Sequence, residues 1–192
     1  TATDVLGASD TKIAVLSVPS VQYSGLIINE FLPDPNLGAT EIDSNQDGVL
    51  DGNQDEFIEI VNNTLADLDL DGCFYSDDSG SGGHVFSPIV VPVGSAVVVF
   101  GGGSITNFND SPAQLSTLGN LSLNNTGDTL SLFDPSSNLL DVVVYSDPGV
   151  PDAESLTRSP DVTGTSFVNH LLASPGNPIS AGRLAAGSPF QT

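Results

Sequence analysis

Residues 123–145 read LNNTGDTLSLFDPSSNLLDVVVY, and this stretch indicates the fold class more clearly than any other. Polar and apolar residues alternate at 129–133, and leucines and valines fill most of 139–145. The DPSSN sequence between them consists of residues that favour tight turns. We therefore predict strands at 129–133 and 139–145, and a hairpin partner at 121–123 that turns through 124–127.

The same pattern extends toward the N-terminus. Short apolar runs separated by Gly, Pro, Asn, Asp and Ser predict further strands, at residues 26–32, 56–61, 68–75, 85–86, 89–91 and 96–100. No stretch of the sequence shows the i, i+3, i+4, i+7 spacing of an amphipathic helix. Residues 146–192 contain several prolines, and we expect them to be rich in loops. The chain is therefore predicted to be all-β, a sandwich or a barrel.

The charge of the chain excludes two classes of partner. Its 192 residues include 24 Asp and Glu but only 3 Lys and Arg, a formal net charge of −21. A nucleic-acid binder needs Lys and Arg to neutralise phosphates, so we expect no nucleic-acid partner. An anionic membrane surface would repel the chain for the same reason. The hydrophobic content of 39% argues against disorder.

The sequence also predicts where the protein works. It contains no Met and no apolar run of about 18 residues, so we expect no membrane insertion. Because Thr1 is not a translation start, we expect that a signal peptide has been removed and that the protein is secreted, extracellular or at the cell surface. The single cysteine, Cys73, is flanked by Gly72, Phe74 and Tyr75, and we expect a buried apolar residue rather than a reactive thiol.

Acidic residues gather in one loop. Seven of the 24 acids lie between Glu41 and Glu59, and the order DSNQDGVLD at residues 43–51 resembles a calcium-binding loop. Oxygen ligands fall at loop positions 1, 3, 5 and 9, a carbonyl at position 7, and Gly48 at position 6, where the turn is sharp. Position 12 is Gln54 rather than a carboxylate, and the next two acids are candidates for the missing ligand. The predicted ligands are Asp43, Asn45, Asp47, the Val49 carbonyl, Asp51, Asp55 and Glu56.

These ligand types favour Ca²⁺ over other metals. Every candidate is a hard oxygen and the loop contains no His or Cys, which argues against Zn²⁺. Mg²⁺ demands stricter octahedral geometry than a long flexible loop supplies. The alternative is a solvated acidic loop without a metal, in which mutual repulsion would leave the segment disordered.

Motifs for catalysis are absent from the sequence. There is no GxSxG or HExxH, and the glycine-rich turn at residues 101–104 lacks the lysine of a phosphate-binding loop. We interpret His84 and His170 as surface or edge residues. Arg158 is interpreted as a structural clamp that pairs with Glu154 or a buried acid, rather than as an anion-binding residue. The sequence therefore predicts a protein that is not an enzyme.

Several motifs together resemble a known family. LIINEFL, DEFIEIVNNT, LDLDGCFYSD, PVGSAVVVF, LNNTGDTLSLFDPSSNLLDVVVY, ESLTR and SPGNP follow one another between residues 26 and 178 in the order of the lamin tail domain. The resemblance implies an immunoglobulin-like β-sandwich, and the inserted acidic loop is similar to that of bacterial secreted members. The family often has Trp where this chain has Phe57 and Cys73 or Phe74.

We expect three regions. Residues 1–24 form an N-terminal extension that contains the apolar run at 13–18, an extended strand segment with the composition of a donor or assembly strand. Residues 25–180 form the lamin-tail-like sandwich, and residues 181–192 a C-terminal tail. Edge-strand addition needs only main-chain hydrogen bonds, so the run at 13–18 is a candidate for self-association into a homopolymer; pairing within its own chain is the alternative.

Two functions are compatible with these observations. The first is a non-enzymatic extracellular structural protein, a calcium-stabilised subunit that assembles into a filament or surface layer through its N-terminal strand. The second is an accessory or binding module of a larger secreted bacterial enzyme or adhesin. A surface polysaccharide is kept as a further candidate ligand.

Overall fold

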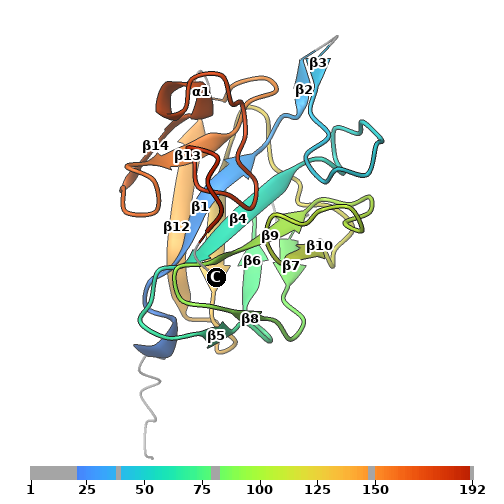
Figure 1. Cartoon of the computed structure of the whole chain (residues 1–192). Coiled ribbons are helices and arrows are strands. Elements are labelled where there is room, and N and C mark those ends of the chain that lie inside the picture. The colour runs from blue at the N-terminus through green and yellow to red at the C-terminus, as the bar shows by residue number, and fades with distance from the viewer. Residues whose placement is uncertain (1–20, 38–39, 79–82, 147–149, 191–192) are drawn as a thin grey trace, which may run out of the picture.

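The computed structural model of the chain describes residues 21–37, 40–78, 83–146 and 150–190, and Figure 1 shows its two layers of strands. The larger sheet has six strands in the order β10-β9-β4-β1-β13-β14, and a second sheet has four in the order β12-β11-β6-β7. Two small sheets, β2-β3 and β5-β8, lie at the ends. Among the described residues, no helix is long and apolar enough to cross a membrane.

The elements have the following bounds. The six-stranded sheet contains β1 (Leu26–Leu32), β4 (Phe57–Asn62), β9 (Ala96–Phe100), β10 (Ala113–Leu115), β13 (Leu156–Ser159) and β14 (Ser166–Asn169). The four-stranded sheet contains β6 (Phe74–Ser76), β7 (Gly83–Val85), β11 (Gly127–Phe133) and β12 (Leu139–Ser146). The short pairs are β2 (Asn36–Leu37) with β3 (Thr40–Glu41), and β5 (Leu68–Asp69) with β8 (Val90–Val91). A 3-10 turn η1 (Val21–Tyr23) precedes β1, and α1 (His170–Ala173) follows β14.

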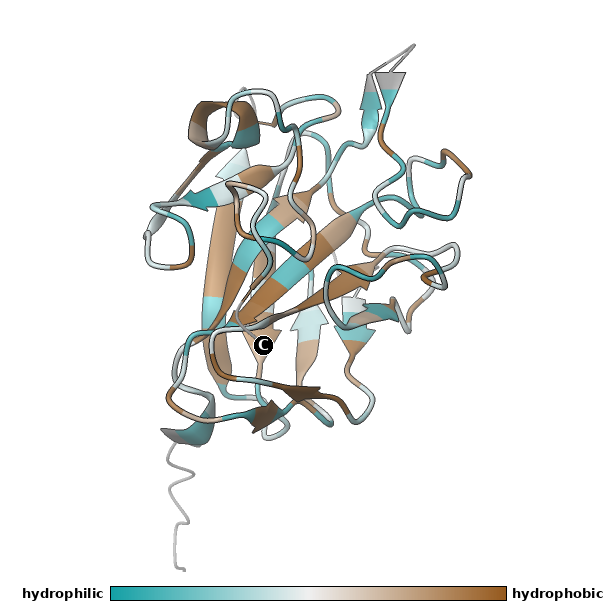
Figure 2. Ribbon diagram, in the orientation of Figure 1, coloured by the Kyte–Doolittle hydropathy of each residue, from teal (hydrophilic) through white to brown (hydrophobic). Residues whose placement is uncertain are grey.

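The main hydrophobic core lies between the two larger sheets, as expected for a sandwich. Ile28, Ile58 and Ile60 of the six-stranded sheet share this core with Leu130 and Leu132 of the four-stranded sheet. Figure 2 shows that the facing strands are mostly hydrophobic, although hydrophilic bands cross β1 and β4. The predicted all-β sandwich is therefore confirmed. Cys73 is fully buried in this core, as predicted.

Two strand predictions were wrong. The expected strand at residues 68–75 is divided into β5 and β6 because the chain turns at Gly72, where φ is +75°. Residues 121–123 are not a strand, and the hairpin is instead formed by β11 and β12 around residues 134–138. Leu70, Leu121 and Leu123 are buried although they lie outside strands, so the alternation of apolar residues did not reveal where the strands end.

The expectation of a loop-rich C-terminal region was also wrong in part. β13 joins the six-stranded sheet beside β1, with Glu30 paired to Thr157, and β14 extends this sheet by one strand. The packing continues past residue 180, since Ala181 and Phe190 are buried and Arg183 pairs with Asp110 at 2.6 Å. β1 and β13, which are far apart in the sequence, therefore lie side by side (Figure 1).

Candidate functional site

Two acidic side chains lie in the middle of the six-stranded sheet. Glu30 of β1 is paired with Glu59 of β4, and both are fully buried. The register between the strands shifts between Ile28 and Glu30, so Asn29 occupies a β-bulge that turns extra polar groups toward this side. A buried carboxylate must be hydrogen-bonded or neutralised, and the surrounding residues show how this is done.

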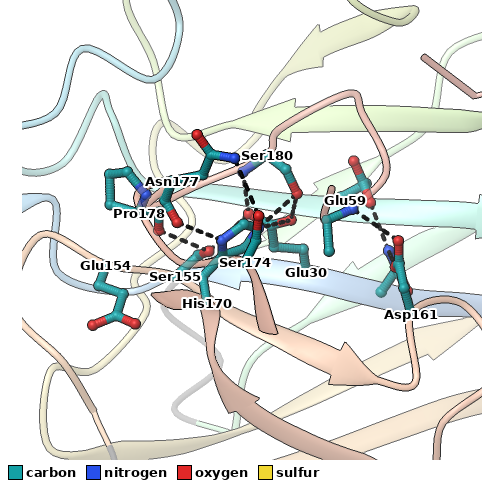
Figure 3. Close-up of polar contacts among 12 residues, drawn as sticks. Glu30, Glu59, Glu154, Ser155, Asp161, His170, Ser174, Asn177, Pro178 and Ser180 are labelled. Carbon is teal, nitrogen blue, oxygen red and sulfur yellow. Dashed lines mark hydrogen bonds and ion pairs between the residues drawn. The ribbon is translucent and has the colours of Figure 1, made fainter. Parts of the chain in front are cut away.

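Glu30 is held by two serines from the C-terminal region. Its Oε1 accepts hydrogen bonds from Ser155 Oγ at 2.7 Å and from the Ser180 amide at 2.8 Å. Its Oε2 accepts a short hydrogen bond from Ser180 Oγ and lies 3.6 Å from His170 Nε2. Figure 3 shows these side chains converging on Glu30. Burial raises the pKa of Glu30, while His170 and the serine hydrogen bonds oppose that shift.

The hydrogen bonds of His170 define where its protons lie. Nδ1 is 2.7 Å from the Asn177 carbonyl oxygen, which can only accept, so Nδ1 carries a proton. Nε2 is 2.8 Å from Ser180 Oγ, whose single proton is directed toward Glu30 when that group is ionised. The Ser180 hydroxyl therefore bridges the imidazole ring of His170 and the carboxyl group of Glu30.

A second branch continues from Glu59. Asn29 Nδ2 donates to Glu59 Oε1 at 2.9 Å and to Asp161 Oδ1 at 3.0 Å. Backbone amides complete the branch, since Gly182 donates to Glu59 Oε2 and Ala185 to Asp161 Oδ2, each at 2.8 Å. Burial and the nearby Glu30 raise the pKa of Glu59 well above its usual value. The branch fixes the C-terminal segment to β1 and β4.

This buried network has the composition of a hydrolase site but not its geometry. In a catalytic triad the acid orients the histidine through Nδ1, whereas here Nδ1 faces the backbone carbonyl of Asn177 and Glu30 lies on the Nε2 side. The side chains of Glu30 and His170 have no exposed surface, and Ser180 is buried. No substrate can approach the Ser180 hydroxyl in this conformation, so the arrangement is that of a structural network.

Arg158 forms a second clamp. Its guanidinium donates to the carbonyls of Ile28 at 2.6 Å and Gly164 at 2.9 Å, and it pairs with Asp141 at 2.6 Å. The prediction of a structural clamp is confirmed. Its acidic partner is Asp141 of β12, so Arg158 links the two larger sheets, while Glu154 accepts the Leu171 amide instead.

Residues 43–48 form the first half of the predicted calcium loop. Asp43 accepts the amides of Asp47 at 3.0 Å and Gly48 at 2.9 Å, and Asn45 Oδ1 also accepts the Asp47 amide. Asp47 Oδ1 accepts the Val49 amide at 2.8 Å. Gly48 has a φ of +85°, in agreement with the sharp turn expected at this position.

The remaining predicted ligands are directed elsewhere. Asp51 accepts the amides of Asn53 and Gln54, which lower its pKa. Asp55 turns inward and accepts the Ser44 and Asp51 amides, and its burial raises its pKa.

Glu56 is buried at the start of β4. It accepts the Leu123 amide at 3.3 Å, and burial raises its pKa to about 8. Within the described segments, no group of three or more His, Cys, Asp or Glu side chains is close enough together to hold a metal ion.

The loop docks on the glycine-rich turn that follows β9. The Ser104 amide donates to Asp47 Oδ2 at 2.9 Å, and Asn45 Nδ2 donates to the Gly102 carbonyl at 3.2 Å. A Cβ atom at Gly103 would lie 2.5 Å from both Asn45 Nδ2 and Asp47 Oδ2. Glycine at this position therefore permits the close approach of the two segments.

The donor set of the loop is compatible with a hard cation. Asp43, Asn45 and Asp47 present side-chain oxygens on one turn, and each oxygen that accepts a single amide keeps a second lone pair. The carboxylate of Asp51 accepts the amides of Asn53 and Gln54 instead of facing these oxygens, so ion binding would require it to change orientation.

Both histidines were predicted to lie at the surface or at an edge. Both are buried, and His84 lies on β7, the last described strand of the four-stranded sheet. His84 Nε2 is 2.9 Å from Gln114 Oε1 and its ring packs against Phe86, and burial lowers its pKa. The signal that could have found the network is the pair of acids inside apolar strands, Glu30 in LIINEFL and Glu59 in EFIEIV, in a chain with so few cations.

One comparison with known proteins gives a match. The family model described as Lamin Tail Domain matches residues 19–147. A search of curated proteins finds no match to the chain.

Proposed function

The chain belongs to the lamin tail domain family, and from this premise we propose that it is a non-enzymatic structural subunit of an extracellular assembly, stabilised by Ca²⁺ bound at residues 43–56. The proposed sites of assembly are residues 13–18, which lie outside the described residues. The protein is proposed to be secreted or held at the cell surface.

The non-enzymatic role is supported by how the polar residues are used. Among the described residues, the constellation with catalytic composition is the buried network of Glu30, His170 and Ser180, which is closed to solvent. Its hydrogen bonds join segments that are distant in the sequence. These residues therefore contribute to stability rather than to substrate contact.

Calcium binding is supported mainly by one observation, the oxygen-lined turn of Asp43, Asn45 and Asp47 that docks on Gly102 and Ser104. The turn is preorganised by its own amides, so an ion would not have to fold the loop from an unfolded state. Among the described residues, the ion pairs of Arg158, His170 and Arg183 involve none of the loop acids. A divalent cation would reduce the mutual repulsion of these acids.

A thermal-unfolding experiment tests calcium. An ion bound only by the folded state stabilises it by about 2.7 kcal/mol at 100 times its dissociation constant, so excess chelator lowers the melting temperature. Asp47→Ala removes most of this difference, and Asp152→Ala, an exposed acid outside the loop, retains it. An unchanged melting curve of the wild-type chain in chelator would contradict the calcium proposal.

Self-association is tested separately by light scattering and negative-stain imaging of the purified chain. We expect assemblies that disappear when residues 1–20 are deleted, with the folded domain retained by circular dichroism. A chain that stays monomeric with and without Ca²⁺ refutes the structural role and favours the accessory module of a larger secreted protein.

A further inference from the structure

A groove lies between the free edges of the two larger sheets. Its volume is about 510 Å³, and its lining comes from β12, β13 and β14, including Val142, Val144 and Phe167. Among the described strands, β12 is hydrogen-bonded only to β11 and β14 only to β13, so each is the last described strand of its sheet. The groove is therefore bordered by two strands that can each accept one further strand.

β12 has the properties of an acceptor strand. It is eight residues long, and the side chains of Val142 and Val144 are 47% and 73% exposed. Long, flat, apolar edges are a liability in soluble proteins, which usually protect them with charges, prolines or a covering segment. Among the described residues that line this groove, the one Lys or Arg is Arg158, and its guanidinium is paired with Asp141.

The chain itself contains a segment that fits this edge. Twenty residues precede Val21, the first described residue, and the run IAVLSV at 13–18 is the apolar part of them. Pro19 directly follows this run, and a residue before proline disfavours the helical conformation, so the sequence is compatible with an added strand.

Charge gives the direction of the added strand. Lys12, one of only three basic residues, directly precedes the apolar run. The C-terminal end of β12, at Val144–Ser146, borders a second hollow lined by Asp78 and Asp128. An antiparallel strand at 12–18 would bring Lys12 to this acidic end.

We infer that residues 12–18 of a second copy of this chain add to β12 as an antiparallel strand and fill the groove between β12 and β14. The inference rests on the proposed self-association and identifies its acceptor surface. Main-chain hydrogen bonds and the burial of Val142 and Val144 stabilise the contact between two strongly acidic chains. Because donor segment and acceptor edge are different surfaces, the contact is head-to-tail and extends into a filament.

Disulfide trapping between variants that each carry one introduced cysteine tests the inference. Val144→Cys is the acceptor, and Val15→Cys and Leu16→Cys are two donors whose side chains point to opposite faces of a strand. Val90→Cys, a valine 58% exposed in β8, is the matched control acceptor. Cys73 is fully buried, so it stays in all variants. In mixtures with a mild oxidant, one donor is expected to crosslink to Val144→Cys at least tenfold faster than to Val90→Cys.

Three results would overturn the inference. Equal crosslinking to Val144→Cys and Val90→Cys shows that the contact does not lie at β12. If the wild-type chain still assembles in that case, the proposed function stands and only this contact is refuted. A bond within one chain, in a variant that carries a donor cysteine and Val144→Cys, shows that the segment covers its own edge. A wild-type chain that remains monomeric refutes the proposed function and this contact together. Circular dichroism of each variant confirms that the exposed substitutions leave the domain folded.

Discussion

Replacing Ser180 with alanine tests the buried network. The hydroxyl bridges Glu30 Oε2 and His170 Nε2, and all three groups are buried. The substitution leaves one carboxyl oxygen and one ring nitrogen without this partner, and each unsatisfied buried group costs about 1–3 kcal/mol. The Ser180 amide still donates to Glu30 Oε1, which limits the loss. We expect the free energy of unfolding to fall by about 2–4 kcal/mol, a large part of the 5–15 kcal/mol of a typical domain.

Urea unfolding followed by circular dichroism measures this change. Ser155→Ala is expected to cost less, because Glu30 Oε1, which accepts the Ser155 hydroxyl, also accepts the Ser180 amide. The second contact of the Ser155 hydroxyl, to the Pro178 carbonyl oxygen, is longer, at 3.3 Å. Ser136→Ala, at an exposed serine in the β11–β12 turn, is the control and is expected to change stability by less than about 0.5 kcal/mol. If Ser180→Ala were as stable as Ser136→Ala, the structural role of the network would be wrong.

Three further predictions concern pH, the loop and the thiol. Because the pKa of Glu59 is raised, the folded state keeps a proton that the unfolded chain releases, so the free energy of unfolding falls as the pH rises above 4.5. Glu59→Gln is expected to reduce this dependence of stability on pH, measured by urea unfolding at several pH values. Gly103→Ala should destabilise the chain more than Gly94→Ala, since both have φ near +75° but only Gly103 has close neighbours; equal losses would argue against docking of the loop. Cys73, buried with a pKa raised to about 12, should react with a thiol reagent only on unfolding.

Local sequence patterns predicted the strands whose burial alternates or is continuous. β1 was predicted to the residue, because an apolar run between Gly25 and Pro33 has no alternative turn signal. β4 was displaced by a single residue, since Glu56 and Asn62 are both polar and buried at its ends. The pattern of polar and apolar residues depends on residues that are adjacent in the sequence, and it was sufficient to locate these strands.

The network could not be predicted in this way. His170 reaches Glu30 through Ser180, and these residues lie in segments that only the complete topology brings together. A histidine in a proline-rich region looks exposed when it is judged from its neighbours. Similarly, the Arg158 clamp was predicted, but its acid was not, because Asp141 belongs to the opposite sheet.

The pairing of β1 with β13 has a consequence for synthesis and for truncation. The family match ends at residue 147, yet Glu30 finds its partners at Ser155 and Ser180, and β1 completes its ladder with residues 156–157. A fragment that ends at residue 147 would leave the buried carboxyl group of Glu30, in β1, without the hydrogen-bond donors of Ser155 and Ser180. Because the chain is synthesised from its N-terminus, β1 can complete its hydrogen bonds only after residues 156–180 have been made. The larger sheet is therefore completed by residues that lie beyond the segment matched by the family model.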